Sequence, residues 1–229
     1  MKKENLSNLA YQDIKSMVLS GVLPAGQPIV ERLVSQKIGI SRTPIREALG
    51  RLEHEGLVRV VPRRGAFPIT LSLREYLSIL TVREVLEGLA ARLAVDHVSN
   101  AKIRELEAIF EKFHNVDNTS MISHQEYALA NVRFHHEILK LSQNPKLMET
   151  IQGLYDHLSL VPWRNIEITE RRVRSIEEHK LILKSLENRD GDMAENTARA
   201  HIRSLRNDVK RVAKTKPELF GDGHQSGEN

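Results

Sequence analysis

Three histidines in the second half of the sequence, His135, His179 and His201, each fall on the apolar side of a different predicted helix. A single histidine in such a position is usually a core residue held by hydrogen bonds. Three of them on the inward faces of three helices favour a shared ligand set, because imidazole is a good ligand for Zn, Ni and Cu ions. Their placement therefore predicts a divalent metal site inside a helical bundle.

Other polar side chains are predicted to face the same interior. Asn131 lies one turn before His135 on the inward side of their helix. Arg83 and Arg172 also point at least partly inward, and either guanidinium could bind a carboxylate ligand through two hydrogen bonds. The alternative for each arginine is a salt bridge, for instance between Arg83 and Glu87 one turn along the helix. The two arginines are candidate effector-binding residues.

A second group of functional side chains begins a helix in the N-terminal third. In the stretch 41–56, SRTPIREALGRLEHEG, apolar residues recur at helical spacing, and Arg42, Thr43 and Arg46 face away from them. Two arginines near the positive end of a helix dipole are electrostatically unfavourable, so a role in folding alone does not explain them. A bound polyanion would explain them, because phosphates favour helix N-termini and arginine hydrogen-bonds guanine edges in the major groove. The stretch is predicted to be a recognition helix; the alternative is an amphipathic helix with a basic solvent face.

Helix and turn signals place this stretch inside a helix-turn-helix. Asn8 is predicted to cap a first helix, which ends near Gly21. A second helix over residues 30–38 is broken by Gly39, and the third begins at Ser41. Two short helices around a tight glycine turn are typical of this DNA-binding motif.

After the third helix, the pattern of apolar residues changes from the helical period to one typical of short strands. Short β-branched runs at 57–61 and 66–69 flank the turn Pro-Arg-Arg-Gly, which predicts a hairpin with Arg64 and Gly65 at its tip. A basic hairpin that follows a recognition helix can act as a wing and reach a neighbouring groove. The alternative is a plain surface hairpin.

The rest of the chain is predicted to be one all-helical bundle, so the fold class is mainly α, with a winged helix-turn-helix followed by helices. The predicted domains are residues 1–70 for DNA binding, 71–215 as an all-helical domain, to which the family resemblance described below assigns effector binding and dimerisation, and 216–229 as a disordered tail. The bundle helices are expected at 73–97, 99–115, 121–142, 146–161, 169–188 and 191–214.

Composition and charge agree with this division. The net charge is +4, but residues 1–70 hold 11 Lys and Arg against 6 Asp and Glu, whereas the remainder holds 23 against 24. A basic module joined to a near-neutral body is typical of nucleic-acid binding. The chain has no cysteine, which excludes disulfides and thiolate metal sites. It shows no secretory signal and no apolar run long enough for a membrane helix, so a cytoplasmic protein with no membrane partner is expected.

The same residues resemble a known family. The stretch 41–57, SRTPIREALGRLEHEGL, closely resembles the signature of GntR-type winged-helix transcription factors. The C-terminal part is similar to the FadR-type (FCD) helical effector domain. That similarity rests on VREVLEGLAARLA (82–94), FHHEILKLSQNP (134–145), EEHKLIL (177–183) and ARAHI (198–202).

The resemblance implies a transcriptional regulator that binds double-stranded DNA as a homodimer and responds to a small molecule, often an organic acid. Two-fold symmetry would match a palindromic operator. By resemblance the DNA contacts fall on Arg32, Ser41, Arg42, Thr43, Arg46 and Gly65, to which the wing argument adds Arg64.

Part of the FCD family binds a divalent metal through an Asp-x-x-x-His pair and two later histidines. His135, His179 and His201 match that pattern, and Asn131 stands at the aspartate position. Asparagine can coordinate through its carbonyl oxygen but brings no charge. The resemblance thus implies a Zn or Ni site formed by Asn131 and the three histidines, with the effector carboxylate at its open positions.

Three other functions fit parts of the sequence. The same regulator could use a metal-free effector pocket. A hydrolase could use the histidines to activate water, but Asn131 occupies the obvious place for its carboxylate base. An architectural DNA-binding protein without an effector would not need a buried polar cluster.

Overall fold

The computed structural model describes the backbone of residues 3–113, 121–161 and 171–220. The chain divides into two compact units. One comprises residues 1–72 together with 153–164, and the other comprises 73–152 and 165–229. The division after Ser72 separates the predicted DNA-binding segment from the first helix of the bundle.

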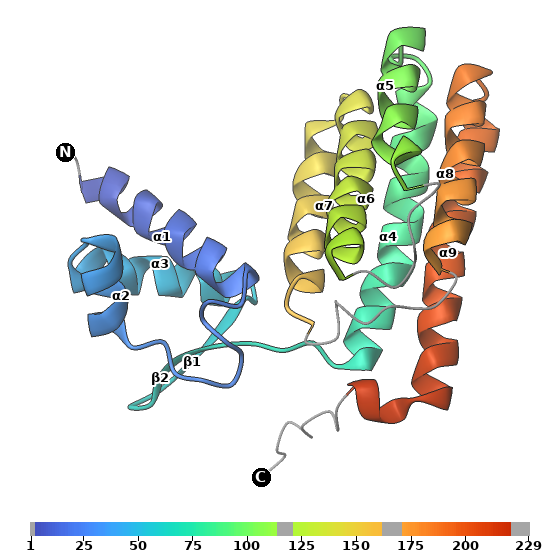
Figure 1. The fold of residues 1–229 in the computed structure, drawn as a ribbon. Helices are drawn as coiled ribbons and strands as arrows, with labels where there is room; N and C mark the ends of the chain where they lie inside the picture. Colours follow the sequence, from blue (N-terminus) through green and yellow to red (C-terminus); the bar gives the residue numbers. More distant parts are fainter. Residues whose placement is uncertain (1–2, 114–120, 162–170, 221–229) are drawn as a thin grey trace. The chain divides into compact units, whose positions relative to one another are not determined.

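The first unit is a winged helix-turn-helix, as predicted. Its helices are held around Ile14, Ile45, Leu52 and Leu57, which are almost completely buried. Gly39 takes a left-handed conformation with φ of 70°, which ends the second helix and allows the tight turn into the third. The helices are α1 Lys3–Leu19, α2 Glu31–Ile38 and α3 Arg42–His54 (Figure 1).

The start of the first helix differs from the prediction. α1 begins at Lys3, so Asn8 lies inside the helix and does not cap it. The Asn8 side chain instead accepts a hydrogen bond of 2.6 Å from Arg51 of α3. The expectation of a cap at Asn8 was wrong because this side chain serves a contact between helices.

The predicted hairpin forms from β1 Val58–Val61 and β2 Gly65–Pro68. The strands are antiparallel and Val61 pairs with Gly65, so the loop between them spans only residues 62–64. Gly65 has φ of 97° and Arg63 has φ of 61°. The tight turn therefore places two residues in the left-handed region, which Gly65 adopts without strain and Arg63 does not.

The second unit is a helical bundle, and the predicted fold class is confirmed. Leu106, Phe134, Ile182, Leu183 and Leu186 form the centre of its apolar core. Figure 1 shows α4, α5, α6, α8 and α9 running side by side. The elements after Ser72 are α4 Leu73–Ala94, α5 Asn100–Glu111, α6 Met121–Leu141, α7 Pro145–Leu158, α8 Arg171–Glu187, α9 Gly191–Thr215 and the short 3-10 helix η1 Pro217–Phe220. The last residues of α7, from Gly153 on, belong to the first unit.

Two features fix the bundle helices in place. Ser99 and Asp190 cap α5 and α9, accepting hydrogen bonds from the backbone N–H groups of Lys102 and Met193. Gly88 lets α4 approach α9 closely, because a Cβ atom there would lie 2.5 Å from Cγ of Arg199. These features fix where α5 and α9 begin and how closely α4 and α9 pack.

Within the predicted disordered tail, Phe220 at the end of η1 is buried, and residues 221–229 lie outside the described residues. None of the helices in the described part of the chain is long and apolar enough to cross a membrane.

Candidate nucleic-acid interface and metal centre

The predicted DNA-contacting side chains gather at the start of α3. Ser41, Arg42, Thr43 and Arg46 are exposed, whereas Pro44 and Ile45 between them are buried. The buried pair anchors the first turn of the helix in the core, so the polar side chains project outward from a rigid base. Arg32 of α2 is also exposed. The arrangement can present arginine side chains to a DNA groove.

Arg46 has a partner that sequence reasoning missed. Its Nε atom lies 3.0 Å from both carboxylate oxygens of Glu31 in α2. The hydrogen bonds and charge of Glu31 raise the pKa of Arg46. The arginine side chain remains 66% exposed, so the pair orients the guanidinium without removing it from solvent.

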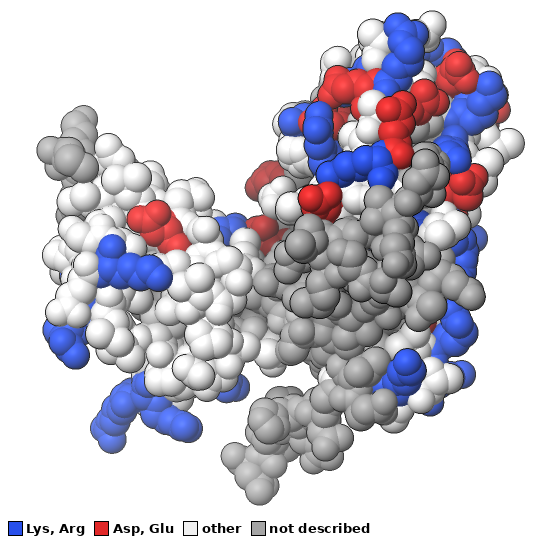
Figure 2. Space-filling view, in the orientation of Figure 1, with Lys and Arg blue, Asp and Glu red and all other residues white. Residues whose placement is uncertain are grey.

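The wing carries a basic tip, and Figure 2 shows Lys and Arg side chains projecting near the hairpin. Arg63, Arg64 and Gly65 are all exposed there. Figure 2 also shows acidic and basic side chains interspersed over the bundle. The hairpin therefore offers the kind of basic projection that can contact a phosphate or a minor groove.

The three predicted histidines meet inside the bundle. His135 of α6, His179 of α8 and His201 of α9 are 4%, 0% and 2% exposed. One nitrogen from each ring lies within 4.8 Å of the corresponding nitrogens of the other two. The Nε2 atoms of His135 and His201 are 3.2 Å apart. The structure thus brings together the side chains that the helical spacing singled out.

A buried carboxylate of α4 holds His135. Glu87 Oε2 lies 2.8 Å from His135 Nδ1, and Glu87 Oε1 accepts a hydrogen bond from Arg83 Nε. Burial alone would raise the pKa of Glu87, but the charges of Arg83 and His135 outweigh it and hold that pKa below its ordinary range. Glu87 is therefore an anion, and the predicted alternative of an Arg83–Glu87 salt bridge is observed.

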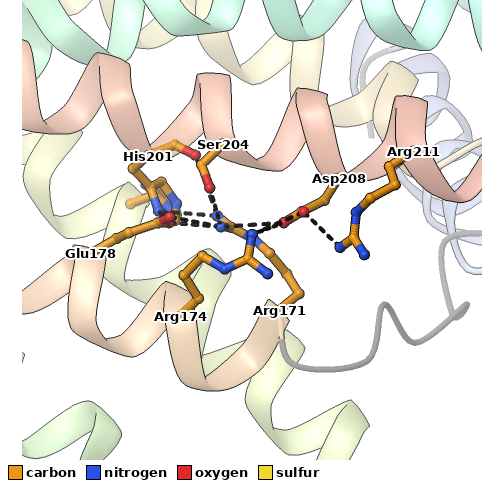
Figure 3. Close-up of polar contacts among 8 residues, drawn as sticks. Arg171, Arg174, Glu178, His201, Ser204, Asp208 and Arg211 are labelled. Carbon is orange, nitrogen blue, oxygen red and sulfur yellow. Dashed lines mark hydrogen bonds and ion pairs between the residues drawn. The ribbon is translucent and has the colours of Figure 1, made fainter.

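A second carboxylate holds His201 (Figure 3). Glu178 Oε2 lies 2.8 Å from His201 Nδ1, and Arg171 Nη1 lies 2.8 Å from the same oxygen. Arg171 also donates to Ser204 Oγ at 2.9 Å and to the His201 carbonyl oxygen at 3.3 Å. Burial, followed by the charge of His135, lowers the pKa of His201 well below its usual value, so this imidazole is neutral.

The third ring, His179, is held by aromatic side chains. Its ring centre lies 4.6 Å from that of Phe110, on which it stacks, and 4.4 Å from that of Phe134. Neither ring nitrogen has a hydrogen-bond partner among the residues that the structure describes. Burial lowers the pKa of His179 well below its usual value. A neutral buried imidazole with two unsatisfied nitrogens is costly unless a ligand is bound to one of them.

These nitrogens suit a divalent metal ion. Neutral imidazole is the form that ligates, and three imidazoles are a common protein contribution to an open zinc site. Two nitrogens at about 2.0–2.1 Å from one tetrahedral ion are about 3.3 Å apart. The His135–His201 separation of 3.2 Å is close to that value. The donor set fits a metal such as Zn or Ni, with positions left for other ligands.

The remaining predicted residues take different positions. Asn131 lies one turn before His135 and is half-buried. Arg83 is buried against Glu87, and Arg172 is buried on α8. The arginine that contacts the histidine cluster is Arg171, which sequence reasoning missed together with Glu178. The spacing of seven residues between these two placed them on one helix face, and this signal could have suggested the pair.

Comparison with known proteins assigns each unit to a family. Residues 6–67 match the family described as bacterial regulatory proteins, gntR family, and residues 78–204 match the FCD domain. The Nta operon transcriptional regulator of Aminobacter aminovorans is 30% identical over 187 residues, which cover 81% of this chain and 86% of the relative. The Glc operon transcriptional activator of Escherichia coli is 27% identical over 232 residues, with 91% of each chain covered.

The fold is also that of a solved structure, E. coli McbR/YncC, with a TM-score of 0.71 and 23% identity over 90% of this chain and 97% of that one. The relatives are named as transcriptional regulators and not as enzymes, so the hydrolase alternative is set aside. A DNA-binding unit with exposed arginines, joined to a bundle with a closed polar centre, matches both families in their order along the chain. The chain belongs to the GntR family of bacterial transcriptional regulators and carries an FCD domain.

Proposed function

We propose that this regulator binds a palindromic operator as a homodimer and releases or engages it in response to a small carboxylate effector bound at a divalent metal. The observation that carries the proposal is the buried histidine cluster, with two unsatisfied nitrogens on His179. An architectural DNA-binding protein would gain nothing from burying such a cluster. The intracellular location of its operator would make the protein cytoplasmic.

The metal would be held by His135, His179 and His201, with Asn131 as the candidate fourth ligand. A bound Zn or Ni ion would supply a positive charge that attracts the effector carboxylate. The protein's own part is to present three imidazoles and to exclude bulk water from them. Arg83 and Arg172 remain candidate effector contacts, although Arg83 already pairs with Glu87.

Dimer formation is supported by an apolar stripe on α4. Val82, Val85 and Leu89 recur at helical spacing and are 48%, 48% and 38% exposed. Exposed apolar residues in a row on one helix face mark a surface that is suited to pairing. A second copy seated there would bring two recognition helices to two half-sites. Arg32, Ser41, Arg42, Thr43, Arg46, Arg64 and Gly65 are the proposed DNA contacts.

The test is metal-dependent and effector-dependent DNA release. Protein stripped with a chelator is loaded with Zn²⁺ or Ni²⁺, and its affinity for an operator fragment is measured with and without a series of organic acids. The proposal expects metal near one equivalent per chain and an effect of an acid only on the loaded protein. An effect of equal size on stripped protein would favour the metal-free effector pocket.

A further inference from the structure

The histidine cluster is backed by two parallel chains of charged side chains. In one, Arg83 contacts Glu87 and Glu87 contacts Nδ1 of His135. In the other, Arg171 contacts Glu178 and Glu178 contacts Nδ1 of His201. We name them the Glu87 relay (Arg83, Glu87, His135) and the Glu178 relay (Arg171, Glu178, His201).

Each carboxylate fixes which ring nitrogen carries the proton. A carboxylate oxygen 2.8 Å from an imidazole nitrogen is placed to accept a hydrogen bond, so the contacts to Glu87 and Glu178 favour Nδ1–H on His135 and His201. Arg171 Nη2 also lies 3.3 Å from His201 Nδ1, but this longer contact cannot be a hydrogen bond to a protonated nitrogen. The Nε2 atoms, on the other side of each ring, are then the nitrogens left for a metal ion.

The helices hold the two Nε2 atoms toward each other, 3.2 Å apart, which is close enough for them to share a proton or a metal ion. His179 differs from the other two rings, because it is flanked by Phe110 and Phe134 and has no carboxylate partner among the described residues. Together these contacts direct ring nitrogens of the three histidines toward one point, where a metal ion could bind.

We infer that Glu87 and Glu178 are positioning residues of the metal site, and that they supply from behind the imidazoles the negative charge that Asn131 does not supply directly. This inference rests on the proposed metal site. A carboxylate hydrogen-bonded to a ligating histidine orients the ring and increases its basicity as a ligand. Arg83 and Arg171 pair with the two carboxylates and hold them against the rings.

In each relay a carboxylate lies 2.8 Å from the Nδ1 atom of a ligand imidazole. Each carboxylate also contacts an arginine, Arg83 or Arg171, whose positive charge offsets part of the negative charge behind the rings. A bound dication would then keep part of its positive charge, which can attract an anionic ligand.

The test compares two pairs of substitutions in the full-length chain. Glu87→Gln and Glu178→Gln remove the charge and keep an oxygen that can accept from Nδ1–H. Glu84→Gln and Glu177→Gln are matched controls on the same helices, because Glu84 pairs with Arg203 and Glu177 pairs with Lys180. Zn²⁺ affinity is measured by competition with a chromophoric chelator. Each relay variant is expected to bind Zn²⁺ about 10–100-fold more weakly than wild type, and the controls are expected to bind as wild type does.

A second measurement reads the proton positions directly and does not depend on metal. Long-range ¹H–¹⁵N spectra of the metal-free wild-type protein are expected to show Nδ1–H on both His135 and His201. Glu178→Leu, which removes the acceptor as well as the charge, is expected to change the His201 pattern. The Glu178 side chain is 18% exposed, so this substitution should disturb folding less than a substitution at buried Glu87.

The outcomes separate the inference from the proposed function. Wild-type protein that takes up no Zn²⁺ would overturn the proposed metal site, whereas the tautomer spectra would still decide whether the carboxylates set the rings. Relay variants that bind Zn²⁺ as tightly as the controls would overturn the inference and leave the metal site standing. Absence of Nδ1–H on either His135 or His201 in the metal-free protein would also overturn it.

Discussion

Arg46 of the recognition helix and Glu31 of the preceding helix form an ion pair, with Arg46 Nε 3.0 Å from both carboxylate oxygens. The pair is too exposed to add much to stability, because surface ion pairs contribute only about 0–1 kcal/mol. Its effect is on direction, since it limits the rotamers of a guanidinium that is 66% exposed. An arginine held in this way can enter a groove with little loss of side-chain entropy.

The first prediction concerns base recognition by the start of α3. Arg46→Ala and Arg42→Ala are each expected to weaken operator binding by about 1–3 kcal/mol and to relax specificity at one base pair. Arg51→Ala is the matched control, because Arg51 lies later on the same helix and donates to Asn8. Footprinting and fluorescence anisotropy on operator variants measure both effects. Unchanged affinity in Arg46→Ala would remove Arg46 from the interface.

The wing is expected to behave differently from the recognition helix. Arg64→Ala should weaken binding to all sequences by a similar factor, because a phosphate contact carries no base information. The slope of log affinity against log salt should fall by about 1 for the lost contact. A salt titration on operator and on unrelated DNA checks this. A loss confined to the operator would instead make Arg64 a base-reading residue.

His179 offers a test in which metal-free stability and metal binding change in opposite directions. His179→Phe removes two unsatisfied buried nitrogens and places a third aromatic ring beside Phe110 and Phe134. An unpaired buried polar group costs about 1–3 kcal/mol, so the metal-free variant should be at least as stable as wild type. Added Zn²⁺ should raise the melting temperature of wild type and not of the variant, because a bound ion favours the folded state. A large destabilisation without metal would show that His179 is an ordinary core histidine.

Asn131 is predicted to tune the charge of the site. Asn131→Asp should tighten metal binding and weaken binding of a carboxylate effector, because the added negative charge attracts the cation and repels the anion. Asn188→Asp adds the same charge at an exposed position after α8 and serves as the control. Calorimetry with the metal alone, and then with organic acids, measures the change in metal affinity and the change in acid affinity separately. Metal affinity equal to that of wild type would mean that Asn131 does not ligate the ion.

The apolar stripe of α4 gives the prediction for assembly. Wild-type protein should show twice the chain mass of 26.1 kDa by light scattering at micromolar concentration. Val85→Glu places a charge in the middle of the stripe and should yield a folded monomer with weakened operator binding. Leu181→Glu, at a 59% exposed apolar position on α8, is the control and should remain a dimer. A Val85→Glu protein of dimer mass would place the interface elsewhere.

The sequence predicted those parts of the molecule that depend on local rules. Gly39 and Ser41 mark the tight turn because a left-handed residue and an exposed N-terminal position are required there. The inward faces of three helices follow from helical angles alone, so His135, His179 and His201 could be grouped. The Arg83–Glu87 pair, four residues apart on one helix, was also within reach of local spacing.

The contacts between helices could not be predicted in the same way. Glu87 meets His135 only because of how α4 packs on α6, and that register depends on the whole core. Arg171 and Arg172 are both buried on α8, at 8% and 7% exposure, but the structure places Arg171 on Glu178 and His201. Neighbouring residues on a helix differ by about 100° in direction, so both arginines can face partly inward. Periodicity therefore could not decide which of them contacts the histidines.

The polar centre also joins parts of the chain that are far apart in sequence. Glu87, His135, Glu178 and His201 come from four different helices, α4, α6, α8 and α9. An ion bound by the histidines would act as a reversible cross-link that closes long loops, and cross-links of long loops chiefly restrict the unfolded chain. Removing the ion would then lower the free energy of unfolding, because the unfolded chain would regain that freedom. Loss of metal and loss of effector control would share one physical origin, a bundle whose helices are no longer tied to a common point.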